Sequence, residues 1–169
     1  MINKVYTREV IENIKIKKLF DNLHISSKIE NNIYKLPFNL EINTPYGFKK
    51  INVLCTTEKI QSVTSYFSNG KTLVSSDEHK LKVNGNWKLV KDIKYNTDII
   101  ETQSGITTLK KRIKKNKKQI LYDLEVDKVH CFYGNNIVCH NTWVLCDVGA
   151  HALKCGLNVN HYTLELSET

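Results

Sequence analysis

Short apolar and β-branched segments, separated by turn residues, dominate the first 141 residues of the chain. Three groups of turn residues punctuate them, Pro45-Tyr46-Gly47, Ser68-Asn69-Gly70 and Asn84-Gly85-Asn86, and such groups are typical of hairpins. The candidate strands are residues 39–43, 51–54, 60–67, 72–75, 80–83, 98–101 and 122–126. Many short strands joined by tight turns predict a compact all-β domain.

Helical periodicity is confined to a few places in the chain. Residues 16–23 predict a short helix, because Leu19, Phe20 and Leu23 fall on one face, and residues 88–93 predict a second, weaker one. Beyond residue 141 apolar residues recur at helical spacing up to Gly156, and residues 157–166 then alternate as a strand does. This change of pattern places a domain boundary near residue 141.

Composition fits one globular domain with a short appendage. The chain has 169 residues and a mass of 19.6 kDa, with 41% hydrophobic and 25% charged residues. No run approaches the ~18 apolar residues of a membrane span, and the first residues lack the apolar stretch of a signal peptide. Five cysteines without a CxxC pair fit reduced thiols better than a disulfide framework. We therefore expect a cytoplasmic protein.

The positive charge is concentrated in one segment. The net charge is +8, and seven of the nine residues 110–118 (KKRIKKNKK) are Lys or Arg. Residues 142–169 carry one basic and three acidic residues, so the charge balance also changes at the boundary. Such a run is most often a solvated loop; contact with nucleic acid or steering of an acidic partner are the functional alternatives.

Candidate chemistry is concentrated immediately before that boundary. Residues 121–142 (LYDLEVDKVHCFYGNNIVCHNT) contain Asp123, His130 and the triplet His140-Asn141-Thr142. An asparagine amide can attack its own backbone carbonyl, which forms a succinimide and expels the amine of the next residue. At Asn141 this reaction would cut the chain before Thr142. Proximity accelerates such a step and imidazoles move its protons near neutral pH, so His140 is a candidate to protonate the leaving nitrogen and His130 to assist the amide.

These residues resemble the C-terminal splicing region of inteins, which ends in His-Asn followed by Ser, Thr or Cys. A second similarity lies in residues 70–81 (GKTLVSSDEHKL), where Ser76 stands three positions before His79, in the manner of the upstream intein motif. The family usually has Thr at the position of Ser76. The resemblance extends over most of residues 1–141 and implies an all-β, horseshoe-like fold of the intein and Hedgehog (Hint) type.

The resemblance also implies roles for the matching residues. Ser76 and His79 would help an N-terminal Cys or Ser to convert its upstream peptide bond into a thioester or ester, and Asp123 would support transfer of that acyl group to Thr142. Cyclisation of Asn141 would then release the intein, and a spontaneous O-to-N shift would leave a peptide bond. No metal or cofactor is required.

The resemblance further implies a partner. The chain begins Met1-Ile2-Asn3-Lys4-Val5, without the first-residue nucleophile, so we expect residues 1–141 to be the C-terminal fragment of a split mini-intein, without an endonuclease, whose first strands come from a short N-terminal fragment with its own extein. Residues 142–169 resemble the ATPase of a phage or bacterial replicative helicase just after its phosphate-binding loop. They would be the C-extein, and nucleic acid would be contacted only through the spliced helicase.

Three alternatives remain at this point. The pairs His130-Cys131 and Cys139-His140 could meet in a hairpin and bind a metal, although their spacing is not that of common zinc motifs. A Hint-type self-cleaving domain would cut without ligating. A basic β domain that binds nucleic acid and is fused to helicase sequence would leave the His-Asn-Thr boundary unexplained.

Overall fold

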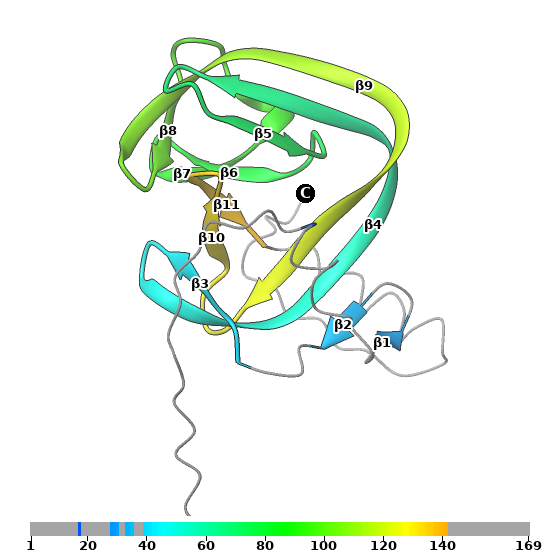
Figure 1. Cartoon of the computed structure of the whole chain (residues 1–169). Helices are drawn as coiled ribbons and strands as arrows, with labels where there is room; N and C mark the ends of the chain where they lie inside the picture. Colours follow the sequence, from blue (N-terminus) through cyan, green and yellow to red (C-terminus); the bar gives the residue numbers. More distant parts are fainter. Residues whose placement is uncertain (1–16, 18–27, 31–32, 36–38, 142–169) are drawn as a thin grey trace, which may run out of the picture.

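The computed structural model describes residues 17, 28–30, 33–35 and 39–141, whose regular structure is almost entirely β. Figure 1 shows these elements along the chain. In order they are β1 (Lys28–Glu30), β2 (Ile33–Lys35), β3 (Glu41–Thr44), β4 (Gly47–Phe67), β5 (Thr72–Ser75), β6 (Lys80–Val83), β7 (Asn86–Leu89), the 3-10 helix η1 (Val90–Asp92), β8 (Ile99–Thr102), β9 (Gly105–Val126), β10 (Cys131–Gly134) and β11 (Ile137–His140). No helix in these residues is long and apolar enough to cross a membrane.

The two longest strands, β4 and β9, form one curved antiparallel ribbon. Their pairing extends from Ile51 opposite Val126 to Phe67 opposite Leu109, and the register shifts at three places along it. Such bulges bend a strand pair and increase its twist. Figure 1 shows the ribbon curving in an open arc with the short strands β6, β7, β10 and β11 on its inner side. This arc has the horseshoe shape that the resemblance to inteins implied.

The last described strand, β11, lies in the middle of the sheet. It pairs with β10, with β6 through Cys139 opposite Leu81, and with β8 through Ile137 opposite Thr102. The path through the sheet is β1-β2-β4-β9-β8-β11-β6-β7, with β3 and β5 on β4 and β10 on β11. All four residues of β11 are buried, as expected for a short apolar run inside a sheet. The candidate residue His140, at the end of β11, is therefore held in the interior of the fold.

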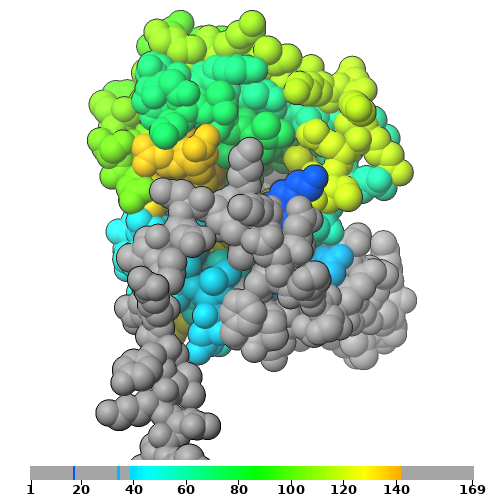
Figure 2. Space-filling view, viewed as in Figure 1, coloured from blue at the N-terminus to red at the C-terminus, as the bar shows by residue number. Residues whose placement is uncertain are grey.

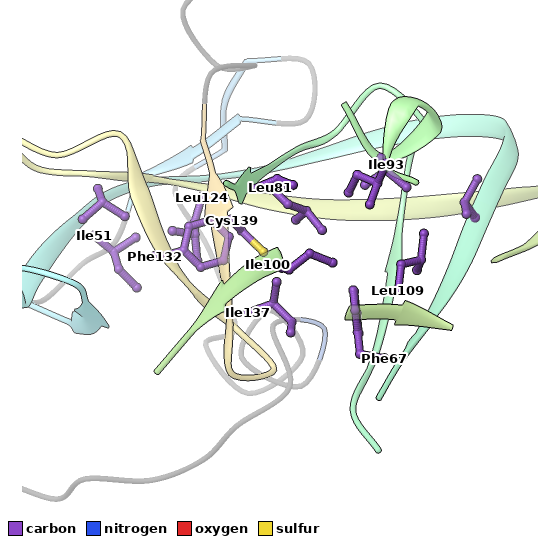
Figure 3. Packing of buried hydrophobic residues seen from close by; sticks show 14 of the residues in the cluster. Ile51, Phe67, Leu81, Ile93, Ile100, Leu109, Leu124, Phe132, Ile137 and Cys139 are labelled. Carbon is purple, nitrogen blue, oxygen red and sulfur yellow. The ribbon is translucent and has the colours of Figure 1, made fainter. Parts of the chain in front are cut away.

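Side chains from several strands close the core around β11. Figure 3 shows Leu81, Ile100 and Leu124 gathered near Phe132, Ile137 and Cys139. Leu81, Ile100 and Ile137 are fully buried, and Leu124 and Cys139 are exposed by only 1%. Ile137 and Cys139 belong to β11 itself, and the others come from β6, β8 and β9, so the packing that fixes β11 depends on contacts between distant parts of the sequence.

Turn residues mark several hairpins, as the sequence predicted. Asn84 and Gly85 both have positive φ, 50° and 78°, as in a type I′ turn, which matches the twist of the strands that it joins. This turn connects β6 to β7 and sets Lys82 opposite Trp87. The expected strands 72–75 and 80–83 coincide with β5 and β6.

The expected bounds of several strands, and one expected helix, required correction. The expected strands 51–54 and 60–67 are parts of the single strand β4, and residues 122–126 are only the end of β9. The weak helix at residues 88–93 is instead the end of β7 followed by η1. The helix at residues 16–23 falls outside the described residues except for residue 17. The helix and strand after residue 141 lie outside them entirely.

The basic run at residues 110–118 is a strand, so the prediction of a loop was wrong. These residues belong to β9 and pair with the second half of β4. Their long side chains are mostly exposed, and Figure 2 shows the yellow-green atoms of this part of β9 along the upper margin. Lys114 lies 3.3 Å from Asp77 and Lys118 lies 2.9 Å from Glu58. A strand accommodates the charges because its polar side chains remain in water while its backbone is paired.

Candidate active site

Asn141 and His140 occupy the end of β11, and both are nearly inaccessible to water. His140 is exposed by 3% and Asn141 by 4%. Figure 2 shows the orange atoms from the end of the described chain against the green strands of the sheet. Burying two polar residues costs free energy unless their polar groups form hydrogen bonds. The contacts of these side chains therefore determine what chemistry the site can support.

The Asn141 side chain is held by main-chain groups of two other segments. Its backbone N–H donates to the His130 carbonyl oxygen over 3.1 Å. The orientation of the amide that satisfies its surroundings places its nitrogen 3.0 Å from the same oxygen, to which it donates, and its oxygen 3.0 Å from the Val126 N–H, which donates to it. A donor on the amide oxygen stabilises the negative charge that forms there when the nitrogen loses a proton. These contacts therefore suit an amide that becomes a nucleophile.

Three imidazoles lie around this end of β11. The His130 and His140 rings are stacked with centroids 6.3 Å apart and planes 20° apart. Burial, and secondarily the charge of His140, lowers the pKa of His79 to about 4. The His79 imidazole is therefore neutral at pH 7. A neutral imidazole can accept a proton at one ring nitrogen and donate one from the other. The structure thus brings His79 to His130, His140 and Asn141, although His79 lies about fifty residues before His130 in the sequence.

Asp123 reaches the same region from the end of β9. Burial raises the pKa of its carboxyl group to about 7, although the Leu124 N–H, which donates to it over 2.8 Å, acts in the opposite direction. The charge of Asp123 also contributes to the raised pKa of Cys139, about 12, for which burial is the main cause. Asp123 therefore lies close enough to β11 to act on it electrostatically, and it can exchange a proton near neutral pH.

Ser76 lies in the turn between β5 and β6, beside His79 in the main chain. Its carbonyl oxygen accepts bonds from the Ser75 hydroxyl over 2.8 Å and from the His79 N–H over 3.4 Å. These bonds close the turn and orient residues 76–79. Thr142 lies outside the described residues.

Sequence reasoning missed two side chains of this site, Trp87 and Lys82. The Trp87 ring meets the His140 ring edge-on, with centroids 4.5 Å apart and planes at 83°, and the Lys82 ammonium lies 5.0 Å from the Trp87 centroid. The Asn84-Gly85 turn predicts a hairpin, and this hairpin places Lys82 opposite Trp87. Their contact with His140 depends on the pairing of β6 with β11, which no local pattern encodes.

The alternative of a metal site at the two His-Cys pairs finds little support in the strand register. Cys131 is opposite His140, whereas Cys139 is opposite Phe132. Because neighbouring residues of a strand point to opposite faces, Cys131 and Cys139 lie on different faces of the sheet. Within the described part of the chain, no three His, Cys, Asp or Glu side chains are placed to hold a metal ion.

Comparisons with known proteins agree on the fold. No family model matches the sequence, and no curated protein is significantly similar to it. Among solved structures, the VidaL intein has a TM-score of 0.61 at 22% identity, covering 76% of this chain and 81% of that one. The PabCDC21-1 intein has a TM-score of 0.62 at 15% identity, covering 76% and 89%. A consensus engineered intein (Cat) with an atypical split site has a TM-score of 0.55 at 23% identity, covering 64% and 87%.

These similarities establish the architecture of the described strands. They form the Hint fold of inteins, so the predictions of an all-β domain and of this fold are confirmed for the described residues, and the predicted α/β tail lies outside them.

Proposed function

We propose that this chain performs protein splicing in trans, as the C-terminal partner of a short N-terminal intein fragment. The observation that carries the proposal is the buried Asn141, whose amide is held by the Val126 N–H and the His130 carbonyl beside three imidazoles. The Hint fold of the described strands supports self-processing chemistry. The resemblance of residues 70–81 and 121–142 to splicing motifs supports ligation rather than cleavage alone.

The resolving step is cyclisation of Asn141. The side-chain nitrogen attacks the carbonyl carbon of Asn141, the C–N bond to Thr142 breaks, and a five-membered succinimide forms. One proton leaves the amide nitrogen, with assistance from His130, and His140 supplies one to the departing nitrogen of Thr142. The Val126 N–H, as donor to the amide oxygen, favours the deprotonated amide.

The earlier steps use the remaining residues and the partner. The N-terminal fragment brings a Cys or Ser whose upstream peptide bond becomes a thioester or ester, assisted by neutral His79 and by Ser76. The Thr142 hydroxyl then attacks that acyl carbon and releases the fragment's thiol or hydroxyl, with Asp123 as the group that takes up and returns a proton. After Asn141 has cyclised, the freed Thr142 amine captures the acyl group. The result is one peptide bond and a single turnover.

The same proposal covers the organisation of the chain. Residues 1–141 are the splicing domain and residues 142–169 a C-extein segment similar to a replicative helicase ATPase, in which Thr142 would later bind the nucleotide's magnesium through its hydroxyl. The reaction takes place in the cytoplasm. One structural neighbour is an engineered intein with an atypical split site, which supports a split intein as compatible with this fold.

Intact-mass spectrometry tests the proposed function. The full chain is incubated alone and with a synthetic Cys-initiated intein start that carries a short upstream peptide. We expect a ligated peptide whose host portion begins at Thr142, and a released fragment that ends in a succinimide at Asn141. Cleavage before Thr142 without ligation would support a self-cleaving domain instead. No change of mass, with association of the two chains confirmed, would overturn the proposal.

The exposed lysines of β9 are expected to accelerate association with an acidic partner fragment. Lys114 already pairs with Asp77 and Lys118 with Glu58, so the informative change is replacement by Gln at Lys110, Lys111, Lys115 and Lys117. At low salt the association rate should fall by about 10-fold, and the difference should shrink as salt screens the charges.

A matched control removes the same charge from exposed lysines outside β9. This variant carries Gln at Lys50, Lys71, Lys91 and Lys94, all of which are exposed. Stopped-flow fluorescence with a labelled partner measures both rates. Equal slowing in the two variants would show that only net charge matters, and an unchanged rate in the β9 variant would remove the steering hypothesis.

A further inference from the structure

An aromatic side chain outside the predicted motifs contacts the residue expected to protonate the leaving group. The Trp87 ring on β7 lies edge-on to the His140 ring on β11, with centroids 4.5 Å apart and planes at 83°. This geometry is the favourable T-shaped arrangement of two aromatic rings. Trp87 is half-buried, whereas His140 is buried, so the indole closes one side of the imidazole.

The strand register explains how Trp87 reaches β11 from a strand that does not pair with it. Leu81 of β6 is opposite Cys139 of β11, and these two residues share one face of the sheet. Their neighbours Lys82 and His140 therefore share the other face. Trp87, opposite Lys82, and Cys131, opposite His140, lie on that same face. The hairpin of β6 and β7 thus places the indole beside the imidazole.

Lys82 adds a second contact that holds the indole. Its ammonium lies 5.0 Å from the Trp87 ring centroid, within the range of a cation–π interaction. The charge of Lys82 also acts on Cys131, where it opposes the larger effect of burial that raises the pKa of that thiol. Since Cys131 pairs with His140, the ammonium, the indole and the imidazole form one compact cluster.

We propose that Trp87 is a positioning residue for His140, which it holds in the orientation that serves the bond before Thr142. This inference rests on the proposed function, in which His140 gives a proton to the departing nitrogen. An imidazole can do so only when one ring nitrogen points at that atom. The edge contact with Trp87 restricts the His140 ring on one side, and the stacked His130 ring lies 6.3 Å away. Lys82 anchors Trp87 in turn.

The first test is kinetic and compares two steps of the reaction. In the full chain with its partner, Trp87→Ala should slow cleavage before Thr142 by about 10- to 100-fold, the usual cost of a misplaced catalytic group. Acyl transfer to Thr142 should change less than twofold, so the branched ester should accumulate in the mass spectrum. Trp87→Phe keeps an aromatic ring and should restore most of the rate. Tyr46→Ala removes an exposed aromatic ring at the turn before β4 and serves as the control.

The second test does not require splicing activity. The pH titration of the His140 ring is followed by NMR in the full chain carrying Asn141→Ala, with and without Trp87→Ala. The charged and titratable groups near His140 include His79, His130, Cys131, Lys82 and Asp123, and both chains retain them. Loss of the indole should move the His140 ring resonances and its midpoint, and Trp87→Phe should move them less.

The outcomes separate this inference from the proposed function. If a folded Trp87→Ala chain cleaves at the native rate, or if both steps slow equally, positioning is overturned. If the native chain fails to cleave at all, the proposed function fails, and the NMR titration alone decides whether Trp87 orients His140. An unchanged titration then overturns the inference, and a shifted one supports it.

Discussion

Replacing Asn141 by alanine is expected to stop cleavage before Thr142, with a loss of at least about 1,000-fold in rate. The side-chain amide is the nucleophile in the proposed reaction, and its placement replaces a bimolecular encounter by an intramolecular one. Water is a poor substitute, because Asn141 is only 4% exposed. Intact-mass spectrometry of the chain with its partner should show a branched ester that accumulates and no released fragment.

The Asn141→Ala variant must also be shown to fold. The substitution leaves the Val126 N–H and the His130 carbonyl without the amide that they bind, which should cost about 1–3 kcal/mol of unfolding free energy. Asn116→Ala, at an exposed position of β9, is the matched control and should cleave at the native rate. A folded Asn141→Ala chain that still releases Thr142 at a similar rate would contradict the assigned nucleophile.

The sequence predicts a strand reliably where a group of turn residues adjoins it. Strands β5 and β6 are examples, since Ser68-Asn69-Gly70 precedes β5 and Asn84-Gly85-Asn86 follows β6. The ribbon of β4 and β9 could not be predicted in the same way. Its register shifts at three places, and each shift changes the face on which the next side chains lie. Alternation of polar and apolar residues is then lost, so one long strand resembles two short ones with a loop between.

The candidate residues His140 and Asn141 were easier to predict than the groups that contact them. His140 and Asn141 are recognisable from residue type and order, because the reaction requires an asparagine before a nucleophilic residue. Trp87 and the Val126 N–H reach His140 and Asn141 through contacts between strands that are distant in sequence, and a main-chain donor has no side-chain signature. A local turn places Lys82 opposite Trp87. The two residues come close to His140 only because β6 pairs with β11.

Asp123 is expected to make both folding and acyl transfer depend on pH. Its pKa is about 7 in the folded chain, raised mainly by burial from the ordinary 3.8. The folded state therefore holds this proton more tightly than the unfolded state, and the contribution to stability is present below about pH 4 and disappears as pH rises to 7. Over that window native stability should fall, relative to Asp123→Asn, by up to about 4 kcal/mol. Urea unfolding at several pH values measures the difference.

The same carboxyl group should set the pH profile of acyl transfer. The native rate should inflect near pH 7, where Asp123 changes charge, and Asp123→Asn should lose both the inflection and about 100-fold in rate, the usual contribution of a positioned acid or base. Asp127→Asn, the same substitution four residues later in the loop after β9, should retain both. The branched ester formed at Thr142 is followed by mass spectrometry. If Asp123→Asn kept the native profile, or Asp127→Asn lost it, the proton would have to be carried by another group.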